Sequence, residues 1–553
     1  MRRLSHDNNE VILMSQPGGA TLNSTTHPPL DHDWVVVGSG FGGSVAALRL
    51  AEKGHRVAVL ERGRAYADEE LPASASDSRR FVWAPKVGLH GIMRNVLFRH
   101  VFSSTQTGVG GGSLVYGGVL FRPHEDFFAD SQWPGPARWE EVLEPHYATA
   151  ERMLGASTTP WESVTSGLTR EVADRFGGSF SAAPVGVFFG EPGVTVPDPY
   201  FGGEGPDRTG CTRCGQCMTG CRIGAANRLT KNYLWFAEKH GAQVFAEREV
   251  VDVTPLGAAD GSDGYRVTTR GSGGPGGRRT SITTRGVVFA AGAVGTNALL
   301  ADCKHRGTLP ALSDRLGHLA RTNSEAVLSV LLPEDIGTWR DVTASSRVVL
   351  DGDTQIEFLT YGPRGDFMRL MFTVLVGEGR GVRRLSAWLR TVARHPRRWF
   401  STMRSGWSAR TLMMLVMQPR DNAIRFVARR RLLGRGYRLT TGRDTERPAP
   451  TYIDAGHRVA EWLAQRTGGV GQSSVFEVFG NRPMTAHVLG GAVVGTSPAT
   501  GVVDADLQVF GYRNMVVCDA AALPANPGVN PALTITALAE HAMSHIPDAG
   551  LGR

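Results

Sequence analysis

The sequence predicts a two-domain α/β protein of mixed α+β organisation, in which a domain built on a parallel sheet is interrupted by an inserted second domain. Three observations lead to this prediction. The chain has 553 residues, which is too many for one ordinary core. Short apolar segments that run into glycine-rich turns, as buried parallel strands do, occur at residues 33–43 and 287–296 and return after residue 485. Residues 321–480 differ, with alternating strand-like runs and an arginine-rich stretch.

The first apolar segment begins a strand–helix–strand unit. Residues 33–37 predict a buried strand, and 38–43 read GSGFGG. A helix is expected over Ser44–Lys53, whose apolar residues have helical spacing, and Gly54 is its stop. A second strand follows over Arg56–Glu61. These elements together predict a compact Rossmann-like βαβ unit.

The glycines of this unit match the pattern G-x-G-x-x-G. Gly38 permits the tight turn, Gly40 lets the backbone approach a pyrophosphate, and Gly43 lets the helix pack closely on the strand. The helix N-terminus supplies N–H donors for the phosphates, and Glu61 is placed to accept from a ribose hydroxyl. The pattern predicts a site for NAD or for the ADP half of FAD, with a purely structural glycine turn as the alternative.

A second glycine-rich loop, residues 108–118, reads GVGGGSLVYGG. With this loop the chain resembles the glucose–methanol–choline (GMC) oxidoreductases, most closely their cholesterol-oxidase-like actinobacterial branch, from about Asp33 to the C-terminus. The resemblance implies a Rossmann-like FAD-binding domain of the GMC type and an inserted substrate domain of mixed β-sheet and helices. It also implies that FAD is the cofactor and that this loop lies along the flavin ring, whereas a glycine loop without a ligand is the alternative.

Further positions match the FAD site of that family. Gly292 begins a second strand–turn–helix, Val250 falls where the backbone contacts adenine, and Pro531 begins a helix facing the pyrimidine end of the flavin. Tyr116 departs from the asparagine of some cholesterol oxidases. The residues expected at the cofactor are Gly38, Gly40, Phe41, Gly43, Glu61, Gly108, Gly110, Gly111, Ser113, Tyr116, Val250, Gly292, Asp519, Ala520, Asn530 and Pro531.

The resemblance also implies catalytic positions. His487 lies in residues 485–491, which read TAHVLGG. The family often has His-Pro-Leu-Gly-Gly here, and Val488 replaces the proline. A histidine titrates near neutral pH and can take the hydroxyl proton of an alcohol, and Asn530 matches the second polar residue of the family's pair. Glu357 lies where cholesterol oxidases carry a glutamate linked to steroid double-bond isomerisation, although a surface glutamate on a strand is an equal alternative.

The function expected from these residues is FAD-dependent oxidation of a sterol-like secondary alcohol to the ketone, with oxygen as the acceptor. The substrate partner is then a hydrophobic small-molecule alcohol. One alternative is a dehydrogenase that passes electrons to a quinone or a protein, and another is a non-catalytic flavin- or lipid-binding protein. The retention of His487 and Asn530 disfavours the last alternative, and the absence of a G-x-S-x-G motif disfavours a hydrolase.

Four of the six cysteines, Cys211, Cys214, Cys217 and Cys221, have the spacing C-x2-C-x2-C-x3-C. This spacing is that of a ferredoxin-type iron–sulfur loop, and four thiolates can also hold zinc. Arg222 stands where ferredoxins have a proline. Because the resembling branch is usually described as FAD-only, we expect reduced structural thiols and no bound metal.

Charge is unevenly distributed along the chain. The net charge is +8, arginine outnumbers lysine 55 to 5, and residues 378–438 alone carry +14. No RNA- or DNA-binding motif accompanies this stretch, so we expect no nucleic-acid partner. The stretch is either a solvated helix or a basic amphipathic surface that contacts anionic lipid, with Trp388 and Trp399 on one face if a single helix continues past Pro396.

The location and the domain boundaries are expectations as well. The 41% of apolar residues excludes a disordered chain, and without an apolar signal segment or an 18-residue apolar run we expect a cytoplasmic protein with peripheral membrane contact as an option. The oligomeric state stays open. The expected organisation is a flexible tail (1–30), an FAD-binding domain (31–155, 211–320 and 484–548) and a substrate domain (156–210 and 321–483).

Overall fold

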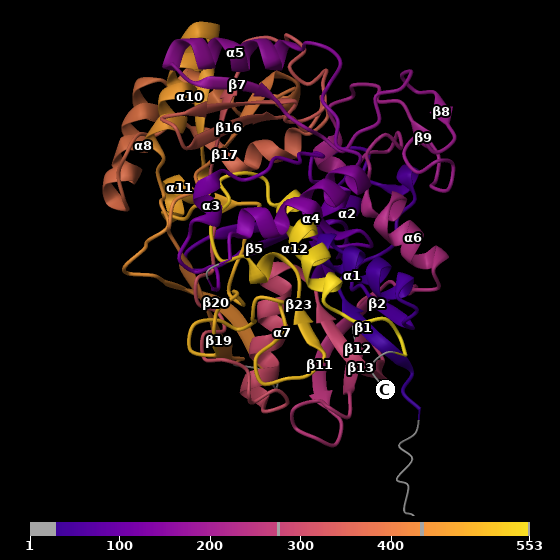
Figure 1. Cartoon of the computed structure of the whole chain (residues 1–553). Helices are drawn as coiled ribbons and strands as arrows, with labels where there is room; N and C mark the ends of the chain where they lie inside the picture. Colours follow the sequence, from indigo (N-terminus) through magenta and orange to yellow (C-terminus); the bar gives the residue numbers. More distant parts are fainter. Residues whose placement is uncertain (1–28, 136, 274–276, 432–435, 551–553) are drawn as a thin grey trace, which may run out of the picture.

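The computed structural model describes residues 29–135, 137–273, 277–431 and 436–550, and two seven-stranded sheets organise this part of the chain (Figure 1). In the first sheet β1 lies between β2 and β13, all parallel, and β10 and β23 extend the parallel part. β12 and β11 are added antiparallel. The strands in sheet order are β10 (Gln243–Phe245), β2 (Val57–Leu60), β1 (His32–Val37), β13 (Arg279–Phe289), β12 (Tyr265–Gly271) and β11 (Arg248–Pro255), and β23 (Met515–Val517) pairs with β13.

Helices cover the first sheet because its strands are apolar on both faces. The four residues of β2 are all buried, and so are ten of the twelve residues of α1. α1 packs against α12 and α6, and α12 packs in turn against α4, so that one continuous core forms. The helices of this layer are α1 (Phe41–Glu52), α4 (Trp139–Leu154), α6 (Tyr233–Lys239), α7 (Gly292–Arg306) and α12 (Ala532–Ser544).

The second sheet is antiparallel throughout and lies above the first in Figure 1. Alternate residues of an antiparallel strand point to opposite faces. On β16, Ile356 and Phe358 pack beneath α5 and α10, so Glu357 between them points to the other face. The order is β17 (Phe372–Val374), β21 (Val470–Ser474), β14 (Ala326–Leu331), β18 (Thr411–Met417), β16 (Thr354–Leu359), β15 (Ser346–Leu350) and β7 (Ser179–Ala182), with α5 (Val164–Phe176) and α10 (Asp454–Thr467) on the covered face.

Smaller elements join or flank the two sheets. A three-stranded sheet brings β22 beside β6, and a hairpin of β19 and β20 packs on α7. These elements are β3 (Trp83–Ala84), β4 (Leu89–His90), β5 (Met93–Leu97), β6 (Phe102–Gln106), β8 (Thr195–Val196), β9 (Arg208–Thr209), β19 (Ile424–Arg430), β20 (Tyr437–Arg443), β22 (Met484–Thr485), α2 (Ser78–Phe81), α3 (Glu125–Phe128), α8 (Val382–Arg394), α9 (Pro396–Ser401) and α11 (Val475–Gly480).

The structure refines several expectations about the elements. α1 begins at Phe41, three residues before the predicted start, because the helix already includes the last two glycines of the turn. No single helix joins Trp388 to Trp399: α8 ends at Arg394 and α9 begins at Pro396, whose ring cannot continue a preceding helix. Residues 1–28 of the expected tail and 274–276 of the glycine-rich loop lie outside the described residues.

The predicted domain boundaries stay a prediction. The strands of the second sheet come from residues 179–182, 326–374, 411–417 and 470–474, whereas the hairpin at 424–443, within the expected substrate domain, packs on α7 of the first layer. Among the helices of the described ranges, none combines the length and the apolar composition that crossing a membrane requires.

Candidate active site

The two glycine-rich loops lie against each other at the carboxyl end of β1. A Cβ added to Gly111 would come within 2.6 Å of the Cα of Gly40, so the loops touch backbone to backbone. A Cβ on Gly43 would lie 2.0 Å from the carbonyl oxygen of Gly38, which explains the close packing of α1 on β1. A Cβ on Gly40 would meet nothing within 4 Å. The structure therefore leaves open space at the N-terminus of α1, where the motif expects a pyrophosphate.

Glu61 accepts hydrogen bonds from both glycine-rich loops. It is 7% exposed at the end of β2. Its Oε2 accepts from the backbone N and the Oγ of Ser39 at 3.2 and 2.8 Å, and its Oε1 accepts from the N–H groups of Gly63 and Gly108 at 2.8 and 3.3 Å. These four donors occupy the acceptor sites of the carboxylate. The expected contact to a ribose hydroxyl therefore requires that one donor, such as the Ser39 hydroxyl, turn away.

The other expected cofactor residues surround the same space. Ser113 donates to the carbonyl of Gly110 at 2.7 Å, and the Phe41 ring meets the Tyr116 ring edge-on with centroids 5.3 Å apart. The Tyr116 hydroxyl donates to the carbonyl of Asn227 at 3.3 Å. Gly292 begins α7 with a φ of +73°, and a Cβ there would face open space. The second loop is thus fixed by its own hydrogen bonds before any ligand binds.

The C-terminal segment adds one buried carboxyl to this layer. Asp519 accepts from the Thr296 hydroxyl at 2.5 Å and from the backbone N–H of Ala521 at 2.7 Å. Burial raises the pKa of Asp519 to about 6, against the opposing effect of these hydrogen bonds. The Ala520 carbonyl accepts from Gly490, which joins this segment to the histidine loop. α12 begins at Ala532, one residue after the expected start, so Pro531 is its N-cap residue, and Val250 lies half-buried on β11 opposite Thr269.

His487 follows β22 and is held by a carboxylate that the sequence analysis did not assign. Its Nδ1 forms a short hydrogen bond with Oε1 of Glu325, and Oε2 of Glu325 accepts from the backbone N–H of Ala486 at 2.9 Å. Glu325 immediately precedes β14, and its side chain has no exposed surface. Burial lowers the pKa of His487, but the charge and the hydrogen bond of Glu325 outweigh burial and raise it. The remaining ring nitrogen, Nε2, is free to act on a substrate.

Glu357 and Asn530 form the second pair of the site. Glu357 is fully buried, so the structure rules out its alternative as a surface residue. Its Oε2 accepts from Nδ2 of Asn530 at 3.2 Å, and its Oε1 accepts from the amide of Gln355 at 2.5 Å. Burial raises the pKa of Glu357 to about 7, although both amides and the charge of His487 act against it. The structure therefore brings the three expected catalytic residues together: Glu357 accepts a hydrogen bond from Asn530, and the charge of His487 acts on Glu357.

Asn530 keeps one polar atom without a partner. Its Oδ1 is buried and makes no hydrogen bond within the described part of the chain. A buried carbonyl oxygen left unpaired costs about 1–3 kcal/mol, so such an atom at an active site points to a ligand. With the open space at Gly40 and at the start of α7, this atom fits a site for a cofactor and a polar substrate group. The residues present therefore suit the expected flavin.

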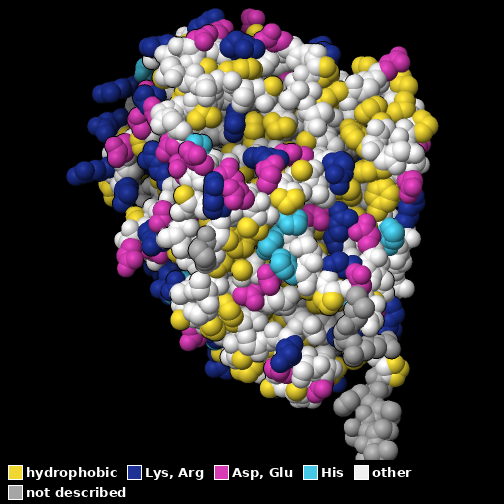
Figure 2. Space-filling model, in the orientation of Figure 1, with side chains coloured by type: hydrophobic (Ala, Val, Ile, Leu, Met, Phe, Trp, Pro, Cys, Tyr) yellow, Lys and Arg dark blue, Asp and Glu magenta, His cyan; other side chains and the backbone are white. Residues whose placement is uncertain are grey.

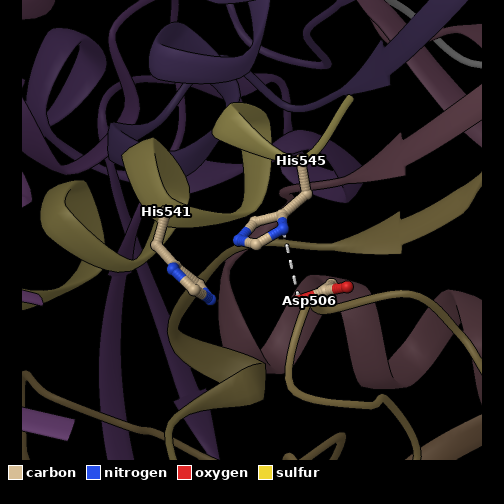
Figure 3. A group of neighbouring side chains, drawn as sticks. All are labelled: Asp506, His541 and His545. Atoms are coloured by element: carbon tan, nitrogen blue, oxygen red, sulfur yellow. Dashed lines mark ion pairs between the residues drawn. The ribbon is translucent and has the colours of Figure 1, made fainter. Parts of the chain in front are cut away.

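The clustered cysteines lie behind the second glycine loop. All four are partly exposed free thiols, and they line one cavity together with Tyr116 and Gly117. No three of their sulfur atoms come within 4.8 Å of one another in the described residues. Among the described residues, three side chains do have ligand atoms within 4.8 Å of one another, those of Asp506, His541 and His545 (Figure 3). That group lies at the opposite end of α12 from Asn530 and takes no part in the active site.

Comparisons with known proteins agree with this site. Residues 33–67 match the family described as FAD binding domain, and residues 472–539 match GMC oxidoreductase. The chain is 44% identical to a cholesterol oxidase of Mycobacterium tuberculosis, over 94% of this chain and 92% of that protein. It is 40% identical to a cholesterol oxidase of Acinetobacter baumannii, over 94% of each.

Solved structures share the fold. An FAD-dependent oxidoreductase from Chaetomium thermophilum superposes with a TM-score of 0.59 at 14% identity, covering 93% of this chain and 98% of that one. FAD is the cofactor, and the chain is an enzyme. The matching profiles, the relatives and the geometry lead to one conclusion: the chain belongs to the GMC oxidoreductase family.

Proposed function

We propose that this enzyme oxidises the 3β-hydroxyl group of a cholesterol-type sterol to the ketone, with oxygen as the final acceptor. The observation that carries the proposal is the His487–Glu325 pair beside the unpaired Oδ1 of Asn530. The similarity to two cholesterol oxidases over nearly the whole chain supports the substrate class.

The residues have distinct tasks in this reaction. His487 donates its Nδ1 proton to Glu325, so Nε2 carries a lone pair that takes the proton of the substrate hydroxyl. Glu325 stabilises the imidazolium that results, because its carboxylate is buried and cannot be screened by water. Asn530 orients the substrate oxygen. Bound FAD would supply the acceptor for the hydride that leaves the carbon bearing this hydroxyl group.

Glu357 is assigned a second task. A buried carboxyl whose pKa is raised to about 7 exchanges its proton readily near neutral pH. We assign to it the proton shuttle that moves the steroid double bond after oxidation. Its hydrogen bond to Asn530 places it next to the group that orients the substrate oxygen.

Purified protein tests the proposal directly. Cholesterol should be converted to the conjugated ketone with one hydrogen peroxide formed per turnover, and the ketone should still form under argon with a dye as acceptor. Turnover with the dye but none with oxygen would favour the dehydrogenase. Failure of any sterol to react, when a simple alcohol does, would contradict the substrate class.

The arginine-rich segment supports a finer proposal, contact with an anionic membrane. On α8, the side chains of Val382, Leu385 and Leu389 fall on one helical face and are 82%, 41% and 54% exposed. Phe400, which follows on α9, is 62% exposed. Figure 2 shows basic side chains projecting from the edge of the molecule over α8. The exposed arginines of this edge are Arg383, Arg390, Arg394, Arg397 and Arg398.

Two residues of the arginine-rich stretch, Arg384 and Trp388, do not belong to this surface. The Arg384 side chain is 1% exposed and donates to the carbonyl groups of Thr451 and Glu477. The Trp388 indole points inward and donates to the Thr373 hydroxyl at 2.8 Å. Exposed apolar side chains flanked by arginines are typical of a helix that lies on a bilayer, and each arginine near an anionic surface adds about 1 kcal/mol.

Co-sedimentation with phosphatidylserine vesicles tests this contact. The native protein should bind at low salt and detach at high salt, and a variant with the five exposed arginines changed to glutamine should stay in solution. A matched control changes five exposed arginines elsewhere, Arg138, Arg170, Arg266, Arg279 and Arg513. Equal binding of both variants would show that the segment is only a solvated surface.

A further inference from the structure

The loop with the four cysteines is left unexplained by the oxidation reaction. The active-site residues described above do not use a thiol, yet four cysteines lie within eleven residues and face one cavity. We propose that Cys211, Cys214, Cys217 and Cys221 hold an iron–sulfur cluster in this cavity.

The surroundings of the cavity suit an inorganic cluster. The sulfurs share this cavity with apolar side chains, such as those of Leu114, Val187 and Ile223, and with residues of the second glycine loop. Asp341, the acidic residue on the wall, already accepts from Trp161 and from Ser345. Thiolate ligands in an apolar cage are what iron–sulfur clusters use. The cysteine sulfurs are therefore the main metal ligands on the wall of this cavity.

Backbone amides point at the sulfurs. The N–H of Arg213 donates to Sγ of Cys211 at 3.5 Å, and backbone N–H groups of Gln216 and Thr343 act on the sulfurs of Cys214 and Cys217. Hydrogen bonds to sulfur are one of the means by which proteins stabilise and tune such clusters.

The spacing of the sulfur atoms argues against a single zinc ion. Four thiolates on one zinc, each at about 2.3 Å, lie roughly 4 Å from one another. In this structure no three of the cysteine sulfurs lie within 4.8 Å of one another in the described residues. A cluster of several bridged iron atoms holds its thiolates farther apart than one ion does. The sulfurs are thus not gathered at the spacing that one zinc ion requires.

The four cysteines form no disulfide in the structure, so their sulfurs are available as ligands. A metal centre binds thiolates by displacing their protons.

From the sequence we expect reduced thiols and no bound metal, and the present proposal departs from that expectation. The cluster would lie directly behind the loop that runs along the flavin, because Tyr116 and Gly117 form part of both. The inference goes beyond the proposed sterol oxidation, since neither His487 nor Glu325 depends on it.

Metal analysis of anaerobically prepared protein tests the proposal. The native enzyme, reconstituted with ferrous iron and sulfide, should retain iron and acid-labile sulfide in equal amounts, more than one of each per FAD. Its reduced form should give a paramagnetic resonance signal. Cys217→Ser and Cys221→Ser should each lose most of this iron and sulfide. Cys303→Ser is the matched control, because Cys303 is a buried free thiol on α7 outside the loop.

The outcomes separate this proposal from the proposed function. Bound zinc, a disulfide within the loop, or FAD-loaded native protein that takes up no iron would each overturn it. If the serine variants fail to fold, which FAD content reports, the reconstitution of the native enzyme still decides. Iron and sulfide in a protein that does not oxidise sterols would leave the cluster standing and refute the proposed function. Sterol turnover by native protein that takes up no iron on reconstitution would leave the proposed function standing and refute the cluster.

Discussion

The two buried carboxylates of the active site, Glu325 and Glu357, lie in contrasting surroundings. Glu325 pairs with the imidazole of His487 and accepts from the backbone of Ala486. Glu357 accepts hydrogen bonds from two neutral amides, those of Gln355 and Asn530, and the charges of His487 and Arg347 act on it without a hydrogen bond. The first arrangement raises the pKa of His487, whereas in the second burial raises the pKa of Glu357 itself to about 7. Surroundings thus make one carboxylate a fixed counter-ion and the other an exchangeable acid.

Loss of His487 should have the largest effect in this comparison. His487→Ala removes the group that takes the hydroxyl proton, and positioned acid–base groups contribute about 10²–10⁴ in rate. Turnover of cholesterol should fall by that factor while FAD stays bound, as its absorbance will show. A variant with near-normal kcat would place the base elsewhere.

Glu325→Gln should have the next largest effect. The imidazolium formed during turnover loses its buried counter-ion, so we expect kcat to fall about 10²-fold. The pKa of His487 should fall as well, because burial then acts without opposition. Since the neutral ring is the active form, the acidic limb of the profile of kcat/KM against pH should move to lower pH. A limb that stays in place would show that Glu325 is only structural.

Glu357→Gln should separate the two steps of the reaction. The ketone should form at a rate within about tenfold of native while its double bond stays unshifted, because one proton-transfer group is lost. In the native enzyme the carboxylate is the active base, so isomerisation should rise with pH and level off above about 7. Glu477→Gln is the control, a second buried carboxyl whose pKa burial raises to about 8 but which contacts no active-site residue. Isomerised product from Glu357→Gln would refute the assignment.

The smallest expected effect tests the amide environment of Glu357. Gln355→Leu removes a hydrogen bond that favours the charged carboxylate, so the pKa of Glu357 should rise further. One such bond contributes about 0.5–1.5 kcal/mol, so isomerisation at pH 7 should slow roughly 2- to 10-fold and recover at higher pH. Equal slowing at every pH would indicate a packing defect instead.

Local patterns allowed the cofactor half of the site to be predicted from the sequence. The first glycine motif, its helix and its two strands depend on neighbouring residues, so their positions followed within a few residues. Glu357 was identified only by resemblance, although the apolar residues on either side of it carry the alternation that turns it to the inner face. The roles of the site residues stay predictions until variants are measured.

Features that depend on contacts between distant segments could not be predicted from the sequence. Glu325 has no pattern around it, and its partner His487 is 162 residues away along the chain. The burial of Arg384 depends on two carbonyl groups from later segments. The four donors to the carboxylate of Glu61 come from both glycine loops and from Gly63, so their number could not follow from either motif.

The most direct test of the account is the reduction of the bound flavin by cholesterol under argon. In a rapid-mixing experiment the native enzyme should bleach its flavin absorbance and release one equivalent of ketone per FAD, and His487→Ala should do so about 10²–10⁴ times more slowly. A flavin that stays oxidised in the presence of cholesterol, or that is reduced equally fast without His487, would contradict the central claim.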